Sequence, residues 1–183
     1  MLKASMSRVL GLDISSSTIG WAVLSCDEGG IQLESYGHIK PPPSKHGSLT
    51  YRLNIALEKA KELFLELAPD EVAVEAYASG FARGRSSANT IIVLSVFNEL
   101  SALVCLRTLG YEPFRYSVSS IRSKISKFYN KKLVSKDDMF DFVSKKFKKF
   151  STINNRNGAI KKECYDETDA IAVALSHIIS ENL

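Results

Sequence analysis

RVLGLDISSSTIGWAVLSC, residues 8–26, holds two runs of β-forming residues on either side of a short serine-rich turn. The first run predicts a strand that ends near Asp13, and the second predicts the strand that pairs with it. Residues 27–30, DEGG, have the composition of a hairpin turn. Residues 31–40 alternate apolar and polar side chains, as a half-exposed strand does. The chain therefore begins with a three-stranded meander whose first strand ends at an acid.

Helices and strands alternate after this meander. Residues 49–68 and 88–109 predict helices, and residues 71–77 and 111–118 predict the fourth and fifth strands. Three more helices are expected: from Ser119 or Ser120 to about residue 128, over residues 136–149 after an N-cap at Ser135, and from Tyr165 to Ile179. We expect a single domain over residues 1–183, an α/β fold with a mixed five-stranded sheet and helices on both faces.

The composition is that of an ordinary globular domain, with 45% hydrophobic and 24% charged residues. No continuous apolar run reaches the roughly 18 residues that indicate a membrane span, and the N-terminus has no secretion signal. Cys26, Cys105 and Cys164 are odd in number and far apart, which favours free thiols in a reducing compartment. We therefore expect a cytoplasmic protein, in a bacterium or a virus-infected host cell, without membrane contact.

Charge is distributed unevenly along the chain. Residues 1–114 carry a net charge of −2, residues 115–162 carry +11, and residues 163–183 carry −5. One interpretation is a solvated lysine-rich helix followed by an acidic tail. The other is a surface that binds a polyanion beside a site that binds cations.

Four carboxylates have the positions of a common site. Asp13 and Glu75 each end an apolar strand, where a carboxylate is costly unless it is paired or bound to metal. If these strands are neighbours, the two carboxylates lie side by side. Asp166 and Asp169 are three residues apart and share one face of the last helix, whereas Glu167 points elsewhere. Acids in a first helical turn have an alternative explanation, because they complement the helix dipole.

Four converging carboxylates repel one another unless a cation lies between them. Mg²⁺ and Mn²⁺ prefer such oxygen ligands, and two ions per site can activate water and stabilise the leaving oxygen of a phosphodiester. That chemistry needs no histidine. His38 and His46 lie far from the acids in sequence, and we interpret His177 as structural.

Three motifs carry a resemblance to a known family. Residues 11–22 resemble the first strand and hairpin of RuvC-type Holliday-junction resolvases, Val74-Glu75 resembles their second acidic motif, and residues 166–170 resemble their closing D-x-x-D-A motif. The resemblance implies an RNase H-like fold of the retroviral-integrase superfamily. It also implies a homodimer that uses divalent metal to nick two opposed strands of a four-way DNA junction. By that resemblance Asp13, Glu75, Asp166 and Asp169 are the catalytic, metal-binding acids.

The resemblance also points to DNA contacts. Many family members have an aromatic residue three positions after the second acid, and this chain has Ala78 there, with Tyr77 and Phe81 nearby. This departure is compatible with a viral or otherwise distant branch. Phe128 and Tyr129 are candidates for stacking on bases, although packing in the core is the favoured role for Phe128. The lysines within residues 145–149 are interpreted as solubilising a helix. The predicted DNA-binding residues are Tyr77, Phe81, Arg83, Arg85, Arg122, Lys124, Lys127, Lys131, Lys132 and Lys136.

The helix expected over residues 88–109 is apolar on nearly all sides and must be covered on both. We expect the sheet to cover one side and a second subunit the other, which gives a two-fold dimer. Alternative functions on the same motifs remain open: a flap or Y-branch debranching nuclease, an RNA-processing nuclease, or a junction-binding module without activity. Residues 11–20 also resemble the first phosphate loop of actin-like ATPases and sugar kinases, but the second such loop is not found.

Overall fold

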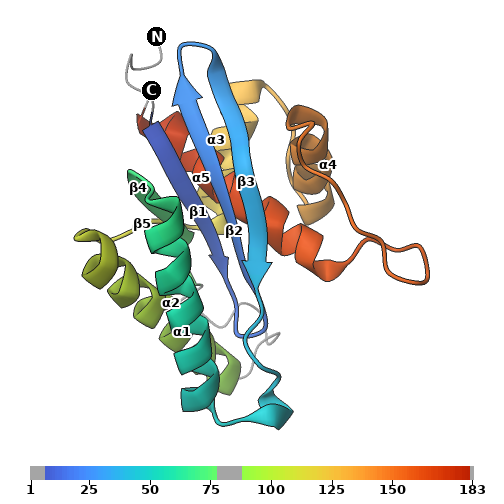
Figure 1. Ribbon diagram of the computed structural model, residues 1–183. Coiled ribbons are helices and arrows are strands. Elements are labelled where there is room, and N and C mark those ends of the chain that lie inside the picture. The colour runs from blue at the N-terminus through green and yellow to red at the C-terminus, as the bar shows by residue number, and fades with distance from the viewer. Residues whose placement is uncertain (1–6, 78–87, 182–183) are drawn as a thin grey trace.

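The structure is a computed structural model that describes residues 7–77 and 88–181 of the 183-residue chain (Figure 1). Its sheet has five strands in the order β3-β2-β1-β4-β5. β1 pairs antiparallel with β2 and parallel with β4, so the meander and the later strands form one mixed sheet, as predicted. The strands are β1 (Ser7–Ile14), β2 (Ile19–Asp27), β3 (Gly30–Ile39), β4 (Glu71–Glu75) and β5 (Phe114–Tyr116).

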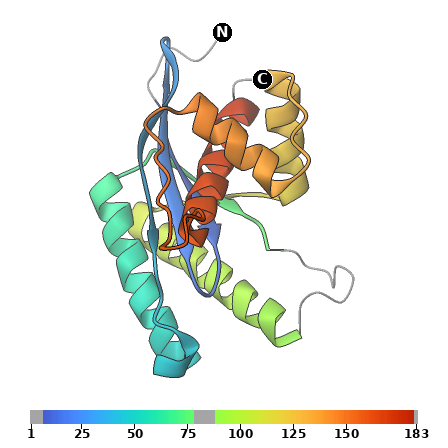
Figure 2. The same cartoon turned by 90° about the vertical axis from the view of Figure 1, so that its right-hand side faces the viewer.

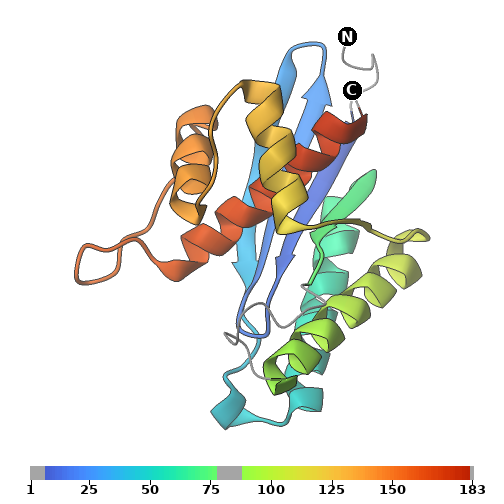
Figure 3. The ribbon, with the colours of Figure 1, turned by 180° about the vertical axis from the view of Figure 1, so that it is seen from behind.

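Helices cover both faces of the sheet, which confirms the expected architecture (Figure 2). α1 and α2 lie on one face, and α3, α4 and α5 lie on the other, with α5 against the strands (Figure 3). The helices are α1 (Leu49–Leu67), α2 (Ala88–Leu109), α3 (Val118–Tyr129), α4 (Lys136–Lys146) and α5 (Lys162–Glu181), and a short 3₁₀ helix spans Ser44–His46.

The alternation of side chains along β1 decides which face receives the acid. Leu10, Leu12 and Ile14 belong to the core under α1 and α2, whereas Val9 belongs to the core under α5. Because successive side chains of a strand point to opposite faces, Asp13 points to the α5 face together with Val9.

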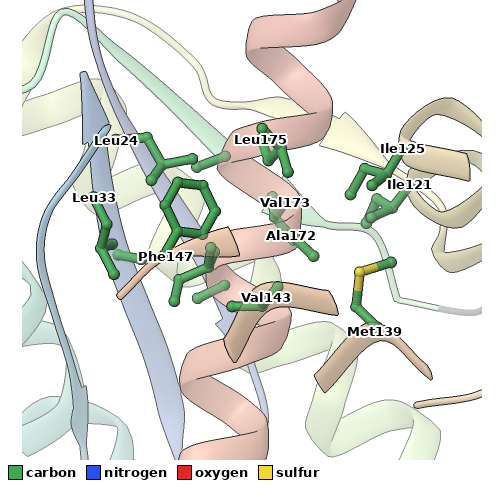
Figure 4. Packing of buried hydrophobic residues seen from close by; sticks show 14 of the residues in the cluster. Leu24, Leu33, Ile121, Ile125, Met139, Val143, Phe147, Ala172, Val173 and Leu175 are labelled. Carbon is green, nitrogen blue, oxygen red and sulfur yellow. The ribbon is translucent and has the colours of Figure 1, made fainter. Parts of the chain in front are cut away.

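α5 lies directly on the backbones of β1 and β2. A side chain at Gly11 would place its Cβ 2.1 Å from the carbonyl oxygen of Ala170, and one at Gly20 would place it 2.2 Å from the carbonyl oxygen of Asp166. The small residues Ala170 and Ala174 of α5 permit the same approach from the helix side. α3 and α4 then pack on the outer side of α5 through apolar residues (Figure 4).

Several element boundaries differ from those expected. α5 begins at Lys162 instead of Tyr165, so the first turn of this helix precedes Asp166. α3 is capped by the hydroxyl of Ser117, which accepts from the backbone amide of Ser120, so the expected cap at Ser119 or Ser120 is wrong. β5 is short, because only three of its residues pair with β4. The cap at Ser135 is confirmed, but α4 ends at Lys146 and not at residue 149.

α2 has one covered and one uncovered side. Phe97 and Cys105 are buried against α1 and the sheet, whereas Ile92 on the outer side is 59% exposed and Leu103 is 39% exposed. An 18-residue window of this helix has a mean hydropathy of 1.7, so by length and composition alone the helix could cross a membrane, which the absence of a continuous apolar run of that length did not predict. Core helices of globular proteins pass the same test but are mostly buried, whereas 28% of the apolar window of α2 is buried.

The close contact at Gly20 makes a prediction about stability. Gly20→Ala should lower the free energy of unfolding by about 3 kcal/mol or more, because the added methyl group overlaps a backbone carbonyl that cannot move without α5. Urea unfolding followed by circular dichroism measures this. Gly29→Ala is the matched control, since its Cβ would meet no backbone atom and only the side-chain carboxylate of Asp27, at 3.1 Å. Equal stability of the two variants would contradict the direct packing of α5 on β2.

Candidate active site

The ends of β1 and β4 bring the first two acids together. Leu12 pairs with Val74 in the parallel register of these strands, and Asp13 and Glu75 are the next residue of each strand. Residues at matching positions of adjacent strands are about 4.8 Å apart and point to the same face. The expectation that these two carboxylates are neighbours is therefore confirmed.

α5 supplies the other two acids from above the sheet. The contact of Gly20 with the backbone of Asp166 fixes this part of the helix beside β1, because Gly20 pairs with Asp13. The helix-dipole explanation for these acids is wrong. α5 begins at Lys162 and the acid of its first turn is Glu163, so Asp166 and Asp169 lie beyond that turn.

The pKa values show that the four carboxylates share one electrostatic environment. Burial raises the pKa of Asp13 well above its ordinary value, and Glu75, Asp169 and Asp166 raise it further. Burial and the nearby Asp169 raise the pKa of Glu75 to about 7. Burial also raises the pKa of both Asp166 and Asp169. A cation among these groups would remove the repulsion and favour their charged forms.

Lys136, the first residue of α4, provides such a cation. Its Nζ lies 2.5 Å from Oδ2 of Asp169 and 4.0 Å from Oδ1 of Asp166. Burial alone would lower the pKa of Lys136, but the attraction of Asp169 and the other acids raises it. Lys136 was predicted as a phosphate contact. The structure places its ammonium group among the acids, where it acts as their internal counter-ion.

The donor set fits a hard divalent cation. Asp13 lies within electrostatic range of the other three acids, and Oδ2 of Asp166 is buried without a hydrogen-bond partner among the described residues. Within residues 7–77 and 88–181, however, no three acidic, histidine or cysteine side chains already converge as ligands of one ion. Lys136 bonds Asp169 instead, so side chains must rotate for a metal to bind.

A hollow of about 830 Å³ opens beside the acids, between the ends of β1 and β4, α2 and the start of α3. Asp13 and Glu75 line it, together with Arg122 and Tyr77, two of the predicted DNA-binding residues. Arg122 also lowers the pKa of Glu75 and of Asp169, so its guanidinium lies within electrostatic range of both. The hollow combines acids that can hold a cation with an arginine that can bind a phosphate.

Two supporting features were not recognised from the sequence. Asn98 of α2 is buried, and its side-chain amide donates to the backbone carbonyl of Glu75 at 3.2 Å. The turn after Asp13 is held by Ser15, whose Oγ accepts from the amide of Thr18, and by Arg52, which donates to the carbonyl of Ser16. A buried asparagine within an apolar helix was the one signal that the sequence offered for such a role.

The other predicted DNA-binding residues lie in different places. Lys124 donates to Ser180 near the end of α5, and its Nζ lies 4.3 Å from the centre of the Tyr116 ring, so its ammonium group lies away from the acids. Lys127, Lys131 and Lys132 are exposed at the far end of α3 and in the segment after it. Phe81, Arg83 and Arg85 lie outside the described residues.

Glu167 points away from the four acids, as expected. It is buried, and its Oε1 lies 2.7 Å from Nδ1 of His38 on β3. His177 is also buried, and its ring nitrogens contact the Tyr116 hydroxyl and the Glu71 carboxylate, each at 2.8 Å. Both histidines therefore bind protein groups that join α5 to the sheet.

Comparison with known proteins connects this chain to resolvases by fold. No protein-family model and no curated protein matches the sequence. RuvC from T. thermophilus in complex with a Holliday junction substrate matches at a TM-score of 0.71 and 15% identity, over 95% of this chain and 94% of that one. A second T. thermophilus RuvC structure matches at 0.68 and 18% identity, over 95% of both chains. The yeast mitochondrial Holliday junction resolvase Ydc2 matches at 0.64 and 15% identity, over 98% of this chain and 80% of that one. These matches show that the chain has the RNase H-like fold of RuvC.

The acid cluster makes a prediction about stability and pH. The pKa of Glu75 is about 7 in the folded protein against an ordinary 4.5, so the folded state binds more protons between these values. Without metal, the contribution of Glu75 to stability is then lost as pH rises through this window. At about pH 8 the free energy of unfolding of Glu75→Gln should exceed that of the parent protein by roughly 1–3 kcal/mol, and this difference should shrink toward about pH 4.5.

Urea unfolding in the presence of a chelator measures this effect. Added Mg²⁺ should stabilise the parent at about pH 8 by mass action and should stabilise Glu75→Gln much less. The parent protein could instead keep the same free energy of unfolding at about pH 4.5 and about pH 8, and Glu75→Gln could equal it at both. That result would show that Glu75 is not held among like charges.

Proposed function

We propose that the protein is a divalent-metal-dependent DNA endonuclease of the RuvC type that nicks opposed strands of four-way junctions. The observation that carries this proposal is the convergence of Asp13, Glu75, Asp166 and Asp169 from β1, β4 and α5, on a fold shared with Holliday-junction resolvases. The sequence motifs that resemble the family contain these same four residues.

The four carboxylates would hold Mg²⁺, or Mn²⁺ in its place, as two ions per site. Bound metal of this kind lowers the pKa of water and stabilises the leaving oxygen of a phosphodiester. The chain's own groups prepare the site. Gly11 and Gly20 let α5 approach until its acids reach those of the sheet, and Asn98 holds the backbone of Glu75.

Cations beside the acids complete the arrangement. Arg122 lines the hollow with Asp13 and Glu75, so it can bind a non-bridging phosphate oxygen of a DNA strand that enters there. Lys136 pairs with Asp169, and its ammonium group could move to a phosphate oxygen when a divalent ion takes over the neutralisation of the acids. The exposed lysines of residues 127–132 extend the positive surface along α3, where contacts to the DNA backbone supply affinity without sequence choice.

Cutting both opposed strands requires two such sites, and we propose a homodimer formed through α2. The exposed apolar side of this helix supports the proposal, because exposed apolar patches of this kind mark contact surfaces between proteins. Sedimentation should give a dimer at micromolar protein concentration, and Ile92→Glu should give a monomer that remains folded. A monomeric parent protein would contradict the proposed association.

Substitution of the acids tests the assignment. Asp13→Asn and Asp169→Asn should each lower the rate of junction cleavage by about a thousandfold or more, because they remove metal ligands. Both variants should still bind the junction with near-normal affinity, since the cationic contacts remain. Gel electrophoresis of a labelled synthetic junction measures cleavage, and a mobility shift measures binding.

Asp137→Asn is the matched control, because Asp137 is an exposed acid one residue after Lys136. It should cut at close to the parent rate. If Asp13→Asn also cut at that rate, Asp13 would not be a metal ligand and the proposed site would be wrong.

A further inference from the structure

A second cleft lies on the outer side of the α3–α4 pair. Its volume is about 530 Å³, within the roughly 300–1,000 Å³ of ligand-binding pockets. The end of α3 at Tyr129, the segment that follows it and one face of α4 form its walls. The inner faces of the two helices pack on α5 (Figure 4), so this cleft opens on the opposite side of the pair.

Lysines form the rim of this cleft and most of them have no acidic partner. Lys131, Lys132, Lys145 and Lys146 line it. Lys145 lies 3.8 Å from the carboxylate of Asp141. Within residues 7–77 and 88–181, no carboxylate lies within ion-pair distance of the other three. The interpretation of residues 145–149 as merely solubilising does not explain why two of these lysines converge on a cleft.

The other acid that lines the cleft, Asp138, is engaged in hydrogen bonds with the backbone. Asp138 accepts hydrogen bonds from the backbone amides of Val134 and Ser135, at 3.0 and 2.8 Å, as part of the cap of α4. These bonds lower the pKa of Asp138 and hold its charge at the helix end. The cleft therefore carries an excess of positive charge that the described part of the chain leaves uncompensated.

Aromatic rings lie beneath these lysines. The rings of Tyr129 and Phe142 have centroids 5.1 Å apart. The Nζ of Lys146 lies 4.6 Å from the centre of the Tyr129 ring and 5.3 Å from that of Phe147. Burial lowers the pKa of Lys146, which shows that its ammonium group has lost part of its water. A partly desolvated cation gains free energy when an anion approaches it.

We propose that this cleft binds one unpaired nucleotide of a DNA strand, with the phosphate on the lysines and the base against Phe142 and Tyr129. A positive rim above aromatic rings is the chemistry by which proteins bind single-stranded nucleic acid. A duplex presents its phosphates but keeps its bases stacked inside, so it would leave the aromatic surface of this cleft unused. That the polymer is DNA rests on the proposed function.

The cleft and the acidic site lie at opposite ends of the same pair of helices, α3 and α4. Arg122 and Tyr129 are both on α3, about 10 Å apart along its axis, and Lys136 and Lys146 mark the two ends of α4. A strand cut at the acids could therefore extend along these helices into the cleft. Unpaired nucleotides near the branch point would then favour binding.

Binding of a fluorescent oligothymidylate to the full chain, in chelator to prevent cleavage, tests the inference. Lys146→Gln should weaken this binding about five- to tenfold at low salt and reduce the salt slope by about 0.7. Phe142→Leu, which keeps an apolar side chain, should weaken it about fivefold or more, because a stacking surface is lost. Circular dichroism confirms that each variant is folded.

Lys148→Gln is the matched control, since Lys148 is exposed nearby but does not line the cleft. It should change binding less than twofold or so. A blunt DNA duplex of the same phosphate number should bind the Phe142 variant almost as well as the parent, because its bases stay stacked inside and do not reach the aromatic rings. Equal losses for Lys146→Gln and Lys148→Gln, or equal losses of duplex and single-strand binding in Phe142→Leu, would overturn the inference.

The two proposals can fail separately. A protein that cuts junctions while the cleft variants bind oligothymidylate like the parent would retain the proposed function and overturn the cleft. A protein that fails to cut any DNA but loses oligothymidylate binding in these variants would retain the cleft as a nucleotide site and overturn the nuclease assignment.

Discussion

α5 rests on the backbones of β1 and β2, because Gly11 and Gly20 have no side chains to hold it away. The rest of the site depends on this contact. Asp13 and Glu75 are placed by strand pairing alone, but Asp166 and Asp169 reach them only when the helix lies at backbone distance from the sheet. Two glycines thus turn a strand-end pair of acids into a cluster of four.

That cluster carries an electrostatic cost, and the structure offsets it with cations. Like charges raise the pKa of Asp13, and burial raises the pKa of all four acids. Lys136 from α4 lies against Asp169, and Arg122 from α3 lies within range of Glu75. The helices that bring these two cations also form the lysine-lined cleft on their outer side. Acid site and basic surface are therefore built from one packing arrangement, which explains why a basic segment precedes an acidic one in the chain.

The sequence predicted the parts of the site that follow from local periodicity. The ends of two predicted strands identified Asp13 and Glu75 as neighbours, and helical periodicity placed Asp169 and Glu167 on different faces of the last helix. The partners that depend on tertiary packing were not predictable in this way. Lys124 and Arg122 are two residues apart on one helix, yet Lys124 donates to Ser180, whereas Arg122 donates to the carbonyl of Val134 and lines the hollow with Asp13 and Glu75. The start of α5 was also not predicted, because no strong capping signal marks Lys162. Since the helix was expected to begin at Tyr165, the sequence could not show that Asp166 lies beyond the first helical turn.

The central claim is that the four acids form a metal site that cuts branched DNA. The most direct measurement is cleavage of a synthetic four-way junction, compared with a linear duplex and a flap of the same sequence, with Mg²⁺ and with chelator. We expect paired symmetric nicks in the junction that require Mg²⁺ or Mn²⁺, and little cutting of the duplex. Equal cutting of all three substrates, or cutting that persists in chelator, would contradict it.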